Sequence, residues 1–153
     1  MDLEKLHIKL GLSGTYWDTK PQYRITVNDF LIKEGEIVAD SDLVEFIEFD
    51  VEYSTEIAKL NISLLNKSDR DTVQSPDKTE ILKDMLLNIE SLEIDEIEVG
   101  HLIYNLGTYT VDKPVYYNGE ATTTVKNCTN LGWNGTWSLT WTNPFYVWLL
   151  ENI

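Results

Sequence analysis

Hydrophobic and polar residues alternate over several short stretches of the first 65 residues. In the first stretch the apolar side chains occupy even positions, whereas His7 and Lys9 occupy odd ones. A period of two is typical of a strand with one buried face, so we expect His7 to point to solvent or into a side-chain ladder. The apolar positions of the three clearest stretches are Leu6, Ile8, Leu10 and Leu12; Tyr23, Ile25 and Val27; and Ala58, Leu60, Ile62 and Leu64.

Two later stretches interrupt the alternation. Within 44–53 the apolar positions change parity between Phe46 and Ile47, and a one-residue phase change of this kind predicts a β-bulge. Residues 81–87 are compatible with a short helical turn. Residues 87–99 have strand character, with a further change of phase inside them.

The last third of the chain is rich in tryptophan and poor in charge. It contains four of the five tryptophans, namely Trp133, Trp137, Trp141 and Trp148. The first three share odd parity, which on one strand predicts either an aromatic core face or an exposed platform for sugar rings or a protein partner. Asn134 and Gly135 form a turn pair, so the alternative is a hairpin that separates Trp133 from Trp137.

Residues 145–150 are apolar at both parities, which predicts a terminal strand that is central in a sheet or buried against a partner. Together these patterns predict an all-β fold, a jelly-roll-like antiparallel β-sandwich. We expect residues 1–100 to form the sandwich. Residues 101–153 form an aromatic C-terminal extension that packs on it or on a partner subunit.

The net charge of −14 is concentrated in residues 1–100, which hold 23 of the 26 acidic side chains. Such an anionic surface repels nucleic acid and anionic membranes, so we expect neither as a partner, and it attracts divalent cations. Solubility alone also accounts for an acidic balance. The N-terminal segment lacks the pattern of a signal peptide and no apolar run reaches transmembrane length, so we expect folding in a cytoplasm.

Few residues suggest covalent chemistry. The one cysteine, Cys128, cannot form an internal disulfide, and two histidines do not suggest a zinc site. The chain has no nucleophile elbow, P-loop or dinucleotide fingerprint. Carboxylates are so abundant that a pair at glycosidase spacing is uninformative. We therefore predict a protein that is not an enzyme, with glycan cleavage as a weaker alternative.

An Asp-rich loop between two strand-like segments is the strongest candidate for metal binding. Calcium takes six to eight oxygen ligands from carboxylates, amide carbonyls and water. The spacing is not that of an EF-hand, and a solvated acidic surface loop is the alternative interpretation. The predicted ligands are Asn66, Asp69, Asp71, Asp77, Asp84 and Asn88.

Aromatic residues provide the other candidate ligand contacts. Tyr16 and Trp17 follow the first predicted strand, where they either stack on a flat ligand or cap one end of the core. With the C-terminal platform, the predicted ligand-binding residues are Tyr16, Trp17, Trp133, Trp137 and Trp141.

The segment 66–99 resembles the calcium-dependent xylan-binding carbohydrate-binding modules. It combines an Asn that closes one strand, an Asp-containing loop, an Asp just ahead of a Leu and Asn segment, and a final acidic strand. The resemblance covers residues 4–100 and implies a jelly-roll fold in which a loop calcium coordinates sugar hydroxyls. It places Asp84, Asn88 and Asn66 at the positions of that family's ligands.

The whole chain is also similar to uncharacterised proteins of contractile-tailed marine cyanophages. The segments LGLSGTYW, KDMLLNIES and VKNCTNLGWNGTW carry this similarity. It implies a virion component that is assembled in the host cytoplasm and contacts other virion proteins or copies of itself. We therefore predict a non-catalytic virion surface protein that binds polysaccharide through a loop calcium, with a purely structural assembly or decoration protein as the alternative.

Overall fold

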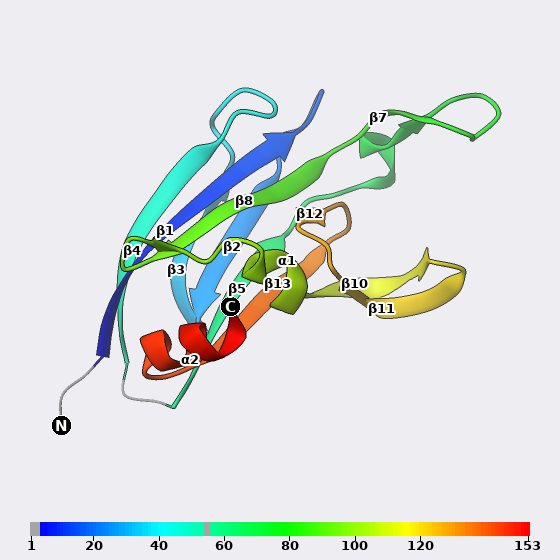
Figure 1. Cartoon of the computed structure of the whole chain (residues 1–153). Helices are drawn as coiled ribbons and strands as arrows, with labels where there is room; N and C mark the ends of the chain where they lie inside the picture. The colour runs from blue at the N-terminus through cyan, green and yellow to red at the C-terminus, as the bar shows by residue number, and fades with distance from the viewer. Residues whose placement is uncertain (1–3, 54–55) are drawn as a thin grey trace.

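The computed structural model describes residues 4–53 and 56–153, which form two main antiparallel sheets, a separate two-stranded hairpin and two short helices (Figure 1). The five-stranded sheet contains, in spatial order, β12 (Asn130–Leu131), β8 (Leu86–Ile94), β1 (Glu4–Thr15) and β4 (Glu45–Tyr53), with β9 (Ile97–Glu98) paired to β8. The six-stranded sheet contains β11 (Glu120–Lys126), β10 (Thr108–Tyr117), β13 (Gly135–Thr142), β5 (Ile57–Leu64), β2 (Gln22–Val27) and β3 (Phe30–Glu36). The predicted antiparallel β-sandwich is confirmed.

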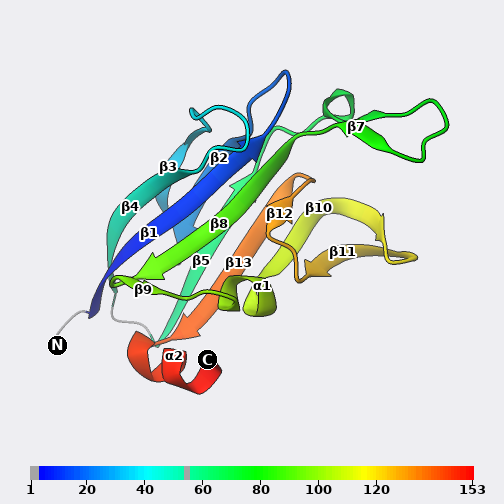
Figure 2. The same cartoon turned by 45° about the horizontal axis from the view of Figure 1, so that its top comes forward.

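The remaining elements lie outside the two sheets. They are the 3₁₀ turn η1 (Asp69–Asp71), the small hairpin of β6 (Val73–Gln74) and β7 (Ile81–Lys83), and the helices α1 (Leu102–Leu106) and α2 (Phe145–Asn152). The β6–β7 and β10–β11 hairpins project from the same side of the sandwich in both views (Figures 1 and 2). Neither described helix combines the length and the apolar content that a membrane crossing requires.

The core lies between the inner faces of the two sheets. All the apolar positions that alternation assigned to β1, β2 and β5 are buried, from Leu6 in β1 to Leu64 in β5. At about 25 cal/mol per Å² of apolar surface, burial of each such side chain contributes roughly 1.5–3 kcal/mol. The alternation therefore assigned the inner and outer faces of these strands correctly.

The strands of residues 101–153 belong to the same two sheets. β13 lies between β10 and β5 inside the six-stranded sheet, and β12 pairs with β8 in the five-stranded sheet. The Trp-rich segment therefore completes the sandwich, whereas the sequence predicted a sandwich of residues 1–100 with an added extension. The difference arises because pairing between distant strands leaves no mark in a local hydrophobic pattern.

The β-bulge predicted in β4 is wrong. β4 pairs with β1 in unbroken register, and Phe46 lies exposed on the outer face, where the Lys9 ammonium is 4.6 Å from its ring centroid. The register shift occurs on the other side of β1, where Leu12 pairs with Ile89 and Gly11 pairs with Ser91. Glu90 is the extra residue between them, so the bulge lies in β8.

Residues 81–87 form no helical turn. Residues 81–83 are strand β7, and β8 begins at Leu86. The change of phase further along separates β8 from β9 at Asp95 and Glu96, which both have positive φ angles of 51° and 67°. Two successive positive φ values are typical of a tight hairpin turn, and this turn lets β9 pair back on β8.

The predicted terminal strand is also wrong, because residues 145–152 form helix α2. Phe145, Trp148 and Leu149 are buried and follow i, i+3, i+4 spacing, so the helix puts one face on the core. A short apolar run without alternation fits a buried strand or a buried helix equally well. Pro144 precedes the helix, a position that proline tolerates because the first turn needs no intrahelical donor.

We predict that Gly107→Ala destabilises the fold. A Cβ at Gly107 would lie 2.2 Å from Nε1 of Trp137, whose indole is fully buried and has little room to move. Overpacking of this kind costs about 1–3 kcal/mol of unfolding free energy, measured by urea denaturation. In the control Gly35→Ala the new Cβ would meet Tyr23 Oη at 3.5 Å, an ordinary contact. Equal stability of the two variants would contradict the packing of Trp137 against Gly107.

We also predict that His7, on the outer face of the five-stranded sheet, stabilises the fold in a pH-dependent way. Its Nδ1 lies 2.8 Å from Asp50 Oδ1 and its Nε2 lies 3.1 Å from Glu48 Oε1. The hydrogen bond to Asp50 and, to a smaller extent, the hydrogen bond to Glu48 raise the pKa of His7 above its ordinary 6.5. The stabilisation by His7 is therefore complete below the pKa that this side chain has in the unfolded chain. It is lost as the pH rises through the higher pKa of the folded state.

The test compares the urea midpoints of wild type and His7→Asn from about pH 5.5 to about pH 9. Wild type should have a higher urea midpoint than His7→Asn at the acidic end of this range. This advantage in midpoint should be absent at the alkaline end. At still lower pH it should shrink again, because the hydrogen bond with His7 lowers the pKa of Asp50, which protonates there. An advantage that does not change with pH, or one that His101→Asn reproduces, would refute the assignment.

Candidate functional site

Two of the predicted calcium ligands, Asp77 and Asp71, form hydrogen bonds within the loops in which they lie. In the β6–β7 hairpin, Oδ1 of Asp77 accepts hydrogen bonds from Oγ of Ser75 (2.6 Å) and from N (3.1 Å) and Oγ1 (2.7 Å) of Thr79. These hydrogen bonds lower the pKa of Asp77 to about 2, and the bond from Ser75 has the largest effect. Asp71 is buried, and its Oδ2 accepts from N (2.7 Å) and Oγ (3.0 Å) of Ser68.

Asp84 is already paired with a cation of the chain. Its Oδ1 accepts from Nζ of Lys67 at 2.6 Å, from Oγ1 of Thr72 at 2.8 Å and from the backbone N of Met85 at 2.9 Å. The side chains of Lys67 and Asp84 are only 11% and 22% exposed. Asp84 therefore sits in a nearly buried ion pair that joins β8 to the loop before η1.

The two predicted asparagine ligands are engaged in different places. Oδ1 of Asn66 accepts from the backbone N of Gln22 at 2.8 Å, and its Nδ2 donates to the carbonyl of Lys20 at 2.9 Å. Asn88 is buried, where its Nδ2 donates to two hydroxyls of β1 and its Oδ1 accepts from Asn130 at 2.8 Å. Both amides hold segments of the sandwich together.

Five of the six predicted ligands thus bond to five separate sets of partners. Within residues 4–53 and 56–153, no three His, Cys, Asp or Glu side chains form a group suited to a metal ion. The donor set that the chain offers does not fit the predicted calcium shell, because one oxygen on each of five of its six side chains already accepts from an amide, a hydroxyl or an ammonium. Asp69 differs from the others, since it is exposed and lines a cleft.

Tyr16 and Trp17, which follow β1, donate hydrogen bonds to the backbone of neighbouring segments. Tyr16 is half-buried and donates from Oη to the carbonyl of Ala39 at 3.0 Å. Trp17 donates from Nε1 to the carbonyl of Asp71 at 3.0 Å, and the Lys83 ammonium lies 4.8 Å from its ring centroid. The ring of Trp17 stays 43% exposed. Tyr16 thus matches the capping alternative, and Trp17 anchors η1 while keeping an open surface.

The three tryptophans predicted to share one strand face lie in different surroundings: two are in the core and one is near the surface. Trp137 and Trp141 are fully buried on the inner face of β13, so they do not form an exposed platform. Trp141 packs edge-on against Phe145 of α2, with ring centroids 6.1 Å apart. Trp133 precedes the strand and is only half-buried. Of the three predicted platform residues, Trp133 keeps a surface for a ligand.

A buried tyrosine positions Trp133. Tyr109 Oη accepts from the backbone N of Trp133 at 2.9 Å and donates to its carbonyl oxygen. The rings of Tyr109 and Tyr117 lie 6.4 Å from the Trp133 indole, the second one edge-on. Burial raises the pKa of Tyr109 far above its ordinary value, so the phenol keeps its proton.

A cleft of about 500 Å³ opens beside Trp133. One wall comes from the chain between β5 and β6, and the other from β10 and the loop before β13. A volume of this size is within the range of small-molecule sites, which combine apolar walls with a few polar groups. The residues that set its chemistry are Trp133, Asn134, Lys67, Asp69, Asp112 and Lys113.

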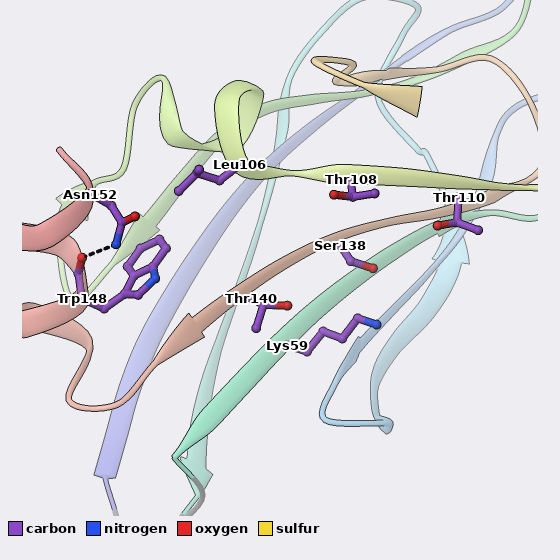
Figure 3. Close-up of a pocket in the computed structure, with 8 residues that line it drawn as sticks. All are labelled: Lys59, Leu106, Thr108, Thr110, Ser138, Thr140, Trp148 and Asn152. Carbon is purple, nitrogen blue, oxygen red and sulfur yellow. Dashed lines mark hydrogen bonds between the residues drawn. The ribbon is translucent and has the colours of Figure 1, made fainter. Parts of the chain in front are cut away.

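A second groove of about 470 Å³ lies on the outer face of the six-stranded sheet (Figure 3). Figure 3 shows its hydroxyl side chains on two neighbouring strands, Thr108 and Thr110 on β10 and Ser138 and Thr140 on β13. The one tryptophan in its lining, Trp148, is buried. This groove is rich in hydroxyls but lacks an open aromatic face, which the cleft beside Trp133 provides.

Comparison with known proteins finds a similar fold in two solved structures of a carbohydrate-binding module. No protein-family model and no curated protein matches the sequence. Two solved structures do match. One is described as vCBM60 in complex with galactobiose, with a TM-score of 0.54, 10% identity, and coverage of 87% of this chain and 96% of that chain. The likeness is one of fold.

The second solved structure is a selenomethionine form of vCBM60, with a TM-score of 0.53, 10% identity, and coverage of 88% of this chain and 89% of that chain. Its description concerns a circular permutation that links two families of calcium-dependent carbohydrate-binding modules. At 10% identity these matches establish the two-sheet sandwich but no residue of a binding site. The site of this chain must therefore be inferred from its own geometry.

The sequence analysis missed most of the cleft. It identified Trp133 and Asp69 but not Lys67, Asn134 or Asp112, which come from three separate segments. Asn134 appeared in the sequence only as a turn residue. Because the cleft forms where β5, β10 and β13 meet, its composition depends on strand pairing that alternation alone does not specify.

We predict that Tyr109→Phe loosens the segment that carries Trp133. The phenylalanine leaves the N–H and C=O of Trp133 without their partner, and an unsatisfied buried group costs about 1–3 kcal/mol. Urea denaturation should show this loss, whereas Tyr116→Phe, an exposed tyrosine of the same strand, should match wild type. Equal stability of the two variants would show that the phenol does not hold Trp133.

Proposed function

We propose that this chain is a non-catalytic carbohydrate-binding module whose glycan docks in the cleft beside Trp133. The observation that supports the proposal best is an open indole, fixed by Tyr109, in the wall of a polar cleft on a sandwich of carbohydrate-binding-module type. The hydroxyl-rich groove has the polar groups but lacks such a ring.

The chemistry of the cleft suits a sugar. One face of a pyranose ring carries C–H groups that pack on an indole, and its rim carries hydroxyls that donate and accept hydrogen bonds. Asp69 and Asp112 offer acceptors, Lys113 offers donors, and the lining is shared between polar and apolar atoms. Neutral sugars also tolerate the strong negative charge of the chain, unlike polyanionic ligands.

Calcium is not part of the binding step proposed here. The description of one fold neighbour names calcium-dependent modules, and the sequence predicted a loop calcium for this chain. Five of the six side chains predicted to hold that ion already accept hydrogen bonds from donors of the chain itself. We therefore propose direct recognition by side chains of the cleft.

The test is calorimetric titration of the purified chain with galactobiose, the sugar of one fold neighbour, and then with a panel of neutral polysaccharides. Trp133→Ala should reduce affinity at least about fivefold, since loss of an aromatic anchor costs more than about 1 kcal/mol. Phe30→Ala removes an exposed aromatic ring of β3 that does not line the cleft, so it should bind like wild type. Equal losses in both variants, or no binding across the panel, would contradict the proposal.

A second candidate is an assembly protein of a virion, which the cyanophage resemblance implied. One feature favours a protein partner: α2 and the residue after it expose apolar side chains, namely Tyr146, Val147, Leu150 and Ile153. Adjacent exposed apolar side chains are typical of interaction surfaces. Analytical ultracentrifugation of the chain separates the candidates. Oligomers that Leu150→Asp dissociates would favour assembly, and a monomer that binds glycan would favour the module.

A further inference from the structure

Lys67 occupies an unusual position for a lysine. Its side chain is only 11% exposed, and its ammonium lies 2.6 Å from Oδ1 of Asp84 and 2.6 Å from the carbonyl oxygen of Met85. Lysine is almost never this buried unless it is paired. The ammonium therefore acts as an internal cation between two oxygen ligands of the chain.

The bonds around this cation connect separate segments. Asp84 Oδ1 also accepts from Oγ1 of Thr72 and from the backbone N of Met85, so the carboxylate joins the loop after η1 to the start of β8. Charge-assisted hydrogen bonds of this length are about twice as strong as neutral ones. Lys67 and Thr72, which both donate to this carboxylate, lie in one wall of the cleft.

The backbone of Lys67 is fixed as well. Its N–H donates to Oδ1 of Asn134 at 2.7 Å, and Nδ2 of Asn134 donates to its carbonyl at 2.9 Å. The amide of Asn134 thus pairs with both main-chain groups of Lys67, as a neighbouring strand would. Since Asn134 follows Trp133, the pair also connects the two walls of the cleft.

We infer that the Lys67 ammonium is the resident cation of this loop cluster, so the cleft keeps its shape without a divalent metal ion. A calcium ion at this point would need six to eight oxygens. The chain provides one carboxylate and one carbonyl there, and in the described residues no metal-binding group of three acidic, histidine or cysteine side chains exists. The ammonium donates to both of those oxygens, and its single positive charge is balanced by the one carboxylate.

The first arm of the test uses the wild-type chain. The metal-stripped protein is heated in chelator and in millimolar calcium at matched ionic strength. The thermal midpoint should be the same in both, because no ion is bound by the folded state alone. A midpoint that rises with calcium would overturn the inference. This arm needs no glycan, so its failure is distinct from failure of the proposed function.

The second arm uses Lys67→Ala and the matched control Lys113→Ala, an exposed lysine of the same cleft. Lys67→Ala leaves Asp84 without its cation and should lower the midpoint by about 5–10 °C, whereas Lys113→Ala should leave it near wild type. Propylammonium chloride replaces the deleted amine, so it should restore part of the loss in Lys67→Ala only. Equal midpoints for the two variants, or no greater response to propylammonium in Lys67→Ala, would overturn the inference.

If Lys67→Ala does not fold, Lys67→Met provides the second variant. Methionine keeps most of the apolar stem and removes the charge, so its midpoint should still lie below that of Lys113→Ala. A midpoint equal to the control would overturn the inference. The wild-type chelator arm is decisive whether or not either variant folds.

Discussion

The pairing of β13 with β5 and β10 is the constraint on which the rest of the structure depends. Gly135 lies opposite Leu64 on one side and Val111 on the other, and a Cβ there would be 2.4 Å from the carbonyl oxygen of Thr110. Only glycine allows this close approach. The register puts Trp137 and Trp141 into the core, since alternate residues of the strand face inward.

The same register creates the cleft. Because β13 starts opposite the end of β5, the residues just before it lie beside the residues just after β5, and Asn134 pairs with the backbone of Lys67. Trp133 is held by Tyr109 of β10 at the same point. Core and cleft are thus two consequences of one strand arrangement, and the buried Tyr109 fixes the half-buried Trp133 between them.

The sequence predicted the parts of this arrangement that depend on local pattern. Alternation identified the inner faces of β1, β2 and β5, and the sandwich followed from them. It did not reveal that β13 lies in the middle of a sheet, and it assigned α2 to a strand because a short apolar run fits both. Composition suggested a calcium loop, but the partner that neutralises Asp84 lies 17 residues away in the sequence.

The most direct test of the account is an amide and indole NMR titration of the ¹⁵N-labelled chain with galactobiose, or with a glycan that shows binding, in the presence of chelator. The account predicts that shifts change for the Trp133 indole and for residues 67–69, 112–113 and 134, which line the cleft. Changes confined to the hydroxyl-rich groove around Thr108 and Ser138, or changes that appear only after calcium is added, would contradict it.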